Sequence, residues 1–160
     1  MGLFGYKKWL IVALTAVAVS SCAKPKALDP QIVENRVAHM YTMRTIGVEL
    51  VEMYETENID DARVAALSKQ LVGQSIALQD FFPIGSSKTQ ISTSNALPVV
   101  WSEKAKFQVA LASFQTKAAA LDNFVATNGA ADAWPKIKET GDACTSCHTQ
   151  FRSGGDPSHD

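Results

Sequence analysis

The 160-residue sequence is poor in the residue types that define several classes of protein. Three cysteines are too few for a miniprotein held together by disulfides. Nine glycines and six prolines exclude a collagen-like chain, and 46% apolar with 19% charged residues argue against a disordered protein. The composition is that of an ordinary globular protein, and the length suits a single domain.

The sequence also lacks an excess of charge of either sign. Fifteen Lys and Arg residues face sixteen Asp and Glu residues, which gives a formal net charge of −1. Domains that bind nucleic acid usually carry a clear excess of basic residues. We therefore expect no nucleic-acid partner.

The apolar run near the N-terminus is too short for a permanent membrane span. It covers residues 9–19 and follows Lys7 and Lys8. At about 1.5 Å per residue, the run extends about 17 Å, well short of the ~30 Å hydrocarbon core. A positive region followed by a short apolar run is typical of an export signal, which we predict for residues 1–21.

A cysteine follows the predicted signal directly. Val19-Ser-Ser-Cys22 resembles the bacterial lipobox, in which the cysteine receives lipid and becomes the new N-terminus. The alternative is plain signal cleavage that leaves Cys22 as a spare thiol. We predict lipidation of Cys22, attachment to a membrane surface facing the periplasm, and a short tether over residues 22–28.

Beyond the tether, apolar residues recur at alternating intervals of three and four, which is the spacing of amphipathic helices. Four such stripes run from Val33 to Tyr54, from Val64 to Phe81, from Val100 to Val125 and from Ile137 to Phe151. We find no strand-like alternation of useful length and no internal repeat. The pattern predicts an all-α protein, an antiparallel four-helix bundle over residues 29–152, followed by a flexible tail over residues 153–160.

Capping residues and turn formers place the helix boundaries. Asp29-Pro30 and Asp60-Asp61 are typical helix starts, and Asn128-Gly129 is a typical stop. We expect the first helix to end near Glu57 and the fourth to begin near Asp132. The polar, aperiodic stretch between Pro83 and Pro98 predicts a long loop.

The run Cys144-Thr-Ser-Cys147-His148 decides the predicted function. Two thiols at this spacing can add across the two vinyl groups of a haem, and the adjacent imidazole is then held against the iron. On a helix, residues three and four apart share one face, so all three side chains can address the same group. We predict one covalently bound haem c, attached through Cys144 and Cys147, with His148 as an iron ligand.

Three other interpretations of this run remain open at this point. A thioredoxin-like redox pair would need a βαβ pattern, which the sequence does not show. A zinc site would need a fourth ligand from His39, His159 or an acidic residue. A structural disulfide between the two cysteines is compatible with export.

An exported helical chain with this run on its last helix resembles the class II c-type cytochromes, the cytochrome c prime family. The resemblance covers about residues 30–152. It rests on Arg36 followed by Met40, on Leu97-Pro98-Val99-Val100-Trp101, on Gly141 three residues before Cys144, and on Phe151-Arg152. It implies a four-helix bundle with haem near one end, exposed along an edge.

The resemblance places Met40 where family members carry either a ligating methionine or a non-ligating apolar side chain. A methionine stripe at helical spacing is also ordinary core packing, which applies to Met40 and Met43 alike. We predict Met40 as the sixth iron ligand. His39 lies about 100° around the helix from Met40, so both cannot face the iron; we expect His39 at the surface, with ligation by His39 in place of Met40 as the alternative.

Two arginines are predicted to contact the haem. Arg36 stands on an otherwise apolar stripe, and a haem propionate would suit its guanidinium, although a side chain that only covers apolar surface would also fit. Arg152, one turn after His148, would orient or shield the imidazole, unless it is an ordinary cation at a helix C-terminus.

These residues predict a lipid-anchored electron carrier with no catalytic turnover of its own. Its partners would be redox proteins, and the acidic stretch from Glu49 to Asp61 would be either a solvated face or a docking patch. A homodimer through the first helix stays open. The alternative function is a five-coordinate haem protein that binds nitric oxide or carbon monoxide, and a peroxidase is a weaker third interpretation.

Overall fold

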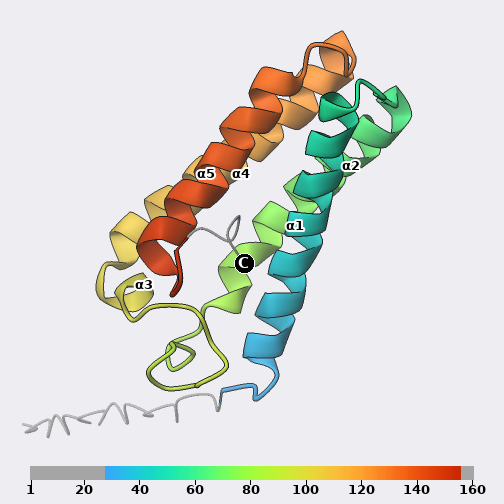
Figure 1. Cartoon of the computed structure of the whole chain (residues 1–160). Coiled ribbons are helices and arrows are strands. Elements are labelled where there is room, and N and C mark those ends of the chain that lie inside the picture. Colours follow the sequence, from blue (N-terminus) through green and yellow to red (C-terminus); the bar gives the residue numbers. More distant parts are fainter. Residues whose placement is uncertain (1–27, 156–160) are drawn as a thin grey trace, which may run out of the picture.

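The computed structural model describes residues 28–155, which form an all-α fold (Figure 1). Four long helices run side by side and make a four-helix bundle, as the sequence predicted. Two short helices accompany them. In chain order the elements are α1 (Ile32–Glu55), α2 (Asp61–Ala77), the 3₁₀ helix η1 (Leu78–Phe81), α3 (Val99–Ser102), α4 (Lys104–Asn128) and α5 (Trp134–Phe151).

The main apolar core lies between the long helices. Its fully buried members include Leu50 from α1, Val64 and Leu67 from α2, and Leu121 from α4. Helix α4 packs along both α2 and α5, whereas α1 contacts α2 and α5 over shorter lengths. The bundle is therefore more open along α1 than between the other long helices.

Most helix ends follow the capping signals in the sequence. The Asp60 carboxylate accepts a hydrogen bond of 3.0 Å from the Arg63 N–H and starts α2. Gly129 has φ 80°, a left-handed conformation that favours glycine, and it ends α4. The first helix begins at Ile32, two residues later than Pro30, because the Asp29 carboxylate accepts from the Gln31 N–H at 2.9 Å and closes a separate turn.

The third predicted helix is interrupted, which the spacing did not predict. Glu103 separates α3 from α4 with φ −117° and ψ 47°, outside the helical region. Val100 before the break and Phe107 after it pack in one small apolar cluster with Ala96 and Phe151. Val100 and Phe107 are thus both buried in one cluster although the helix is interrupted between them.

The predicted export signal, Cys22 and most of the tether lie outside the described residues, as do residues 156–160. Over residues 28–155, no helix combines the length and apolar character that a bilayer crossing requires. An isolated antiparallel bridge joins Ala96 to Arg152. It connects the loop after η1 to the end of α5.

Candidate functional site

A cavity of about 660 Å³ opens between the helices. Ligand pockets usually measure about 300–1,000 Å³, so the volume suits a cofactor. Side chains from α1, α2, η1, α4 and α5 line it, and most of them are apolar, including Leu78, Leu111 and Phe114. The open bundle edge between α1 and α5 thus forms an apolar binding site.

The three residues that the sequence singled out on α5 all line this cavity. Cys144, Cys147 and His148 come from the last two turns of the helix and share one face, as their spacing predicted. Both cysteines are free thiols, so the structure contains no disulfide between them. The site therefore presents two sulfur atoms and one imidazole to one apolar space.

Burial strongly affects the acidity of the two thiols. It raises the pKa of Cys144 to about 12, with a smaller contribution from the nearby Cys147, and it raises the pKa of Cys147 to about 11. Both groups are neutral thiols at physiological pH. A reactive redox pair needs a thiolate with a depressed pKa, so this environment does not favour the thioredoxin-like interpretation.

The opposite wall of the cavity is formed by α1. Met40 and Met43 lie three residues apart on this helix, and both line the cavity with His148. Met40 is partly exposed and Met43 is buried. The structure therefore brings the predicted sixth ligand, Met40, into the same cavity as the predicted proximal ligand.

His39 points elsewhere. Its Nε2 atom lies 2.7 Å from the backbone oxygen of Gln74 in α2, and its ring packs against Phe81 with the centroids 4.8 Å apart. The side chain is partly buried and bonded to a neighbouring helix. Among the residues that line the cavity, Met40 is present and His39 is not.

Arg36 has a set of partners that sequence spacing did not predict. The buried guanidinium donates to the Phe81 oxygen at 2.9 Å, to the Ser86 hydroxyl at 3.0 Å, to the Ser86 backbone oxygen at 2.9 Å and to the Ser94 hydroxyl at 2.7 Å. It also stacks over the Phe82 ring, 4.9 Å from the centroid. Arg36 therefore holds the loop that follows η1.

The buried charge of Arg36 has no acidic partner within the part of the chain that the structure describes. Burial lowers the pKa of Arg36 from its ordinary value, which reflects the cost of removing the cation from water. Arginine has five N–H donors, and the one at Nε takes no part in these four bonds. The propionate contact stays a prediction, and an anion would compensate this charge.

Arg152 lies just after α5. Its backbone N–H donates to the His148 oxygen at 3.0 Å, and its guanidinium donates to the Gly155 oxygen at 3.0 Å. It does not line the cavity. Its predicted action on the imidazole therefore stays a prediction.

The mouth of the cavity contains charged residues, of which Glu52 and Glu55 belong to the acidic stretch noted from the sequence, whereas Arg44 was missed. Arg44, Glu52 and Glu55 are exposed and line it from α1. A spacing of three or four residues counted from Met40 passes through Arg44 and Glu55, beside the apolar stripe. This second stripe is the sequence pattern that could have predicted the charged residues at the mouth.

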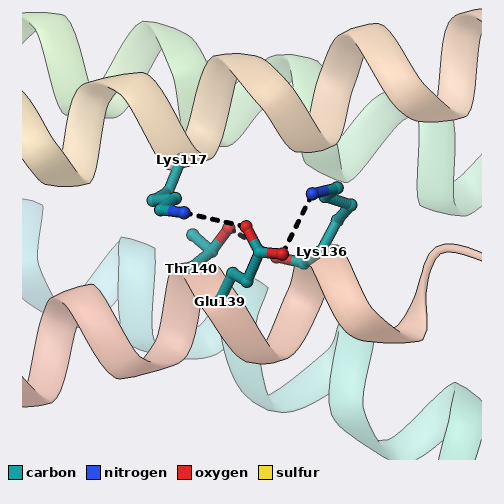
Figure 2. A network of polar contacts seen from close by, with 4 residues as sticks. All are labelled: Lys117, Lys136, Glu139 and Thr140. Carbon is teal, nitrogen blue, oxygen red and sulfur yellow. Dashed lines mark hydrogen bonds and ion pairs between the residues drawn. The ribbon is translucent and has the colours of Figure 1, made fainter.

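A polar network holds α5 against α4 (Figure 2). The Glu139 carboxylate lies between Lys117 of α4 and Lys136 of α5 and pairs with both ammonium groups at 2.9 Å. Next to it, the Thr140 hydroxyl donates to the Lys136 oxygen at 2.8 Å, and Thr140 lines the cavity. The network fixes the first half of α5, and Cys144 follows one turn later.

The chain is similar to known proteins over most of its length. The family model described as "Cytochrome C'" matches residues 31–152, which includes both cavity walls and the complete Cys-x-x-Cys-His run. The chain belongs to the cytochrome c' family. A curated relative, cytochrome c-554 of Cereibacter sphaeroides, is 27% identical over 145 residues, which cover 89% of this chain and 94% of the relative.

Solved structures agree with this assignment to the cytochrome c' family. The cytochrome c' of Rhodopseudomonas palustris is 27% identical, with a TM-score of 0.68, over 78% of this chain and 98% of that chain. The cytochrome c' of Rhodobacter sphaeroides is 25% identical, with a TM-score of 0.70, over 76% of this chain and 95% of that chain.

Cytochrome c' proteins carry covalently attached haem c, and the residues of this site fit that group. Cys144 and Cys147 would form the two thioether bonds, and His148 would supply an imidazole nitrogen to the iron. The apolar lining matches the porphyrin faces, and the Arg44 cation at the mouth is complementary to an exposed carboxylate. Haem c is thus the cofactor of this chain.

Proposed function

We propose that this monohaem cytochrome c' transfers electrons, with His148 and Met40 as the two axial ligands. Bound haem supplies reversible one-electron chemistry at iron, and His/Met ligation raises its potential. The observation that supports the proposal is the placement of Met40 and His148 in the walls of one apolar cavity.

The chain's own residues would keep the ligand set unchanged between the two oxidation states. Buried side chains such as Leu50, Phe114 and Leu121 exclude water from the cavity. A dry site with fixed ligands reorganises little when its charge changes, which favours a carrier. Arg36 would balance one haem carboxylate, because its buried cation lacks an acidic partner among residues 28–155.

Absorption and electron paramagnetic resonance spectra of the Met40→Ala holoprotein test the ligation. We expect a low-spin haem in the wild type and a high-spin haem in the variant. Met53→Ala is the matched control, because Met53 is a partly buried methionine of α1 that does not line the cavity. Met43→Ala should also leave the spectrum low-spin, since the proposal assigns the iron to Met40.

The same experiment separates the carrier from a gas-binding protein. A wild-type haem that is already high-spin, and that binds carbon monoxide as fast as the Met40→Ala variant, would show that Met40 is not a ligand. Binding of nitric oxide or carbon monoxide would then replace electron transfer as the proposed function. A low-spin spectrum that is lost only in Met43→Ala would show that Met43, and not Met40, binds the iron.

Family members are periplasmic, and we propose that this chain is held there by lipid on Cys22. Its partners would be redox proteins that approach the exposed cavity mouth. Cys22→Ala should convert a membrane-bound protein into one released by cell fractionation. Recovery of the wild type in the released fraction would contradict the anchor.

We also propose that two copies associate through α1. Val37 and Tyr41 are more than half exposed and lie four residues apart, so they share one face of this helix, and neither lines the cavity. Pairing with the same face of a second copy would bury both side chains. Sedimentation should give a dimer for the wild type and a monomer for Tyr41→Glu.

A further inference from the structure

The loop after η1 is attached to α1 and to the end of α5, the two helices that face each other across the cavity. We call residues 86–97 the strap; it lies at the end of the bundle, beside α3 (Figure 1). Two of its serines, Ser86 and Ser94, are completely buried. Buried hydroxyl groups in a surface loop need partners, and here those partners come from α1 and from the strap itself.

On the α1 side, the strap is attached to Arg36. Two of the guanidinium's hydrogen bonds reach Ser86, and a third, of 2.7 Å, reaches the Ser94 hydroxyl. Arg36 lies four residues before Met40, about one helical turn away on the same helix. The attachment point is therefore close to the proposed distal ligand.

On the α5 side, the strap is attached to the residues just after His148. The Leu97 N–H donates to the Phe151 oxygen at 2.9 Å, and the Ser153 N–H donates to the Asn95 oxygen at 2.8 Å. Ala96 forms the bridge to Arg152, which follows His148 by four residues. The strap thus spans from one turn beyond the proximal ligand to one turn before the distal one.

Ser94 joins the two attachments. Its hydroxyl oxygen accepts from Arg36 and from the Ala96 N–H at 3.2 Å, and its O–H donates to the Ser86 backbone oxygen at 2.9 Å. These three bonds use the full capacity of a hydroxyl group. One side chain therefore links the segment held by α1 to the segment held by α5.

We propose that Ser94 is a positioning residue for the axial ligands, because the strap sets how far the α1 wall stands from the α5 wall. Helices α1 and α5 are separated by the cavity, so side-chain packing between them is reduced there. The hydrogen-bonded strap supplies a connection at the end where Met40 and His148 lie. The inference rests on the proposed ligation by Met40.

The test compares Ser94→Ala with Ser68→Ala in the holoprotein. Ser68 is equally buried, and its single O–H lies within hydrogen-bond reach of the Ala65 oxygen at 3.1 Å and of the Asp122 carboxylate at 2.9 Å, away from the strap. Added imidazole competes with Met40 for the iron. In Ser94→Ala we expect part of the haem to become high-spin. We also expect the apparent affinity for imidazole to rise on the order of tenfold, because the free energy of about one net hydrogen bond corresponds to a factor of that size.

The control separates positioning from general destabilisation. Both variants lose buried hydroxyl bonds, so both should unfold more easily, but only Ser94→Ala should change the spin state and the imidazole affinity. If Ser94→Ala keeps the wild-type spectrum and affinity, or if Ser68→Ala changes them equally, the inference is wrong while Met40 ligation stands. If Met40→Ala leaves the spectrum unchanged, the proposed ligation fails and the inference fails with it.

A second variant covers the case in which Ser94→Ala does not fold. Ser86→Ala keeps all three bonds of Ser94 and removes the hydroxyl that accepts from Arg36 at 3.0 Å and donates to the Pro83 oxygen at 2.9 Å. We expect the same change in spin state and imidazole affinity, at smaller amplitude. An unaltered spectrum in a folded Ser86→Ala protein would overturn the role of the strap.

Discussion

Replacing Arg36 with leucine should measure how strongly the loop after η1 is held. The substitution keeps an apolar stem of similar shape and removes the guanidinium, which donates four hydrogen bonds to Phe81, Ser86 and Ser94. Some of those oxygens would stay buried without a donor. The loop should therefore lose its attachment to α1.

Two opposing effects set the magnitude. Each buried acceptor left without a partner costs about 1–3 kcal/mol, and hydrogen bonds from a charged donor are at the upper end of that range. Removing the buried cation offsets part of this loss in stability, because the charge no longer has to be desolvated on folding. We expect a net loss of about 3 kcal/mol in the free energy of unfolding, or about 10 °C in Tm.

Thermal and urea unfolding of the holoprotein, followed by circular dichroism, would check the value. Arg63→Leu is the control, because Arg63 pairs with Glu49 at the surface and its removal should have a much smaller effect. Equal losses in the two variants, or a stable Arg36→Leu protein, would refute the reasoning. The second result would mean that desolvation of the cation outweighs its four hydrogen bonds.

Two more substitutions probe the bundle. Leu121→Ala removes a fully buried side chain of α4 that also lines the cavity, so it should cost about 3 kcal/mol in urea unfolding; a loss below about 1 kcal/mol would show that the site collapses freely. Hydrogen bonds from Lys117 and Lys136 hold the pKa of Glu139 below its ordinary 4.5, so this network stabilises the fold above that pH and its contribution is lost as the pH falls below it. The stability difference between wild type and Glu139→Gln should therefore be present at pH 7 and shrink in acid, and a difference independent of pH would contradict the assignment.

The elements that sequence alone predicted correctly depend on local interactions. The 3-4 spacing of apolar residues specified four long helices, the Asp60 cap specified where α2 begins, and Gly129 specified where α4 ends. The predicted face shared by Cys144, Cys147 and His148 also follows from helix geometry within a single element. None of these inferences needs knowledge of a distant residue.

What the sequence missed depends on contacts between distant segments. The partners of Arg36 lie 45, 50 and 58 residues further along the chain, so no local pattern could reveal that the guanidinium holds a loop. The interruption at Glu103 likewise goes with packing of Val100 and Phe107 against the end of α5. Spacing within one helix contains no information on either arrangement.

The sequence by itself determined the four long helical segments, the haem-binding run and the cofactor, because each is encoded by residues a few positions apart. Only the tertiary structure decided that Met40 and His148 face one cavity, that His39 faces α2, and that a strap joins the two walls. Those outcomes depend on how helices pack across the bundle, where the free energy comes from burial and hydrogen bonding between segments far apart in the chain.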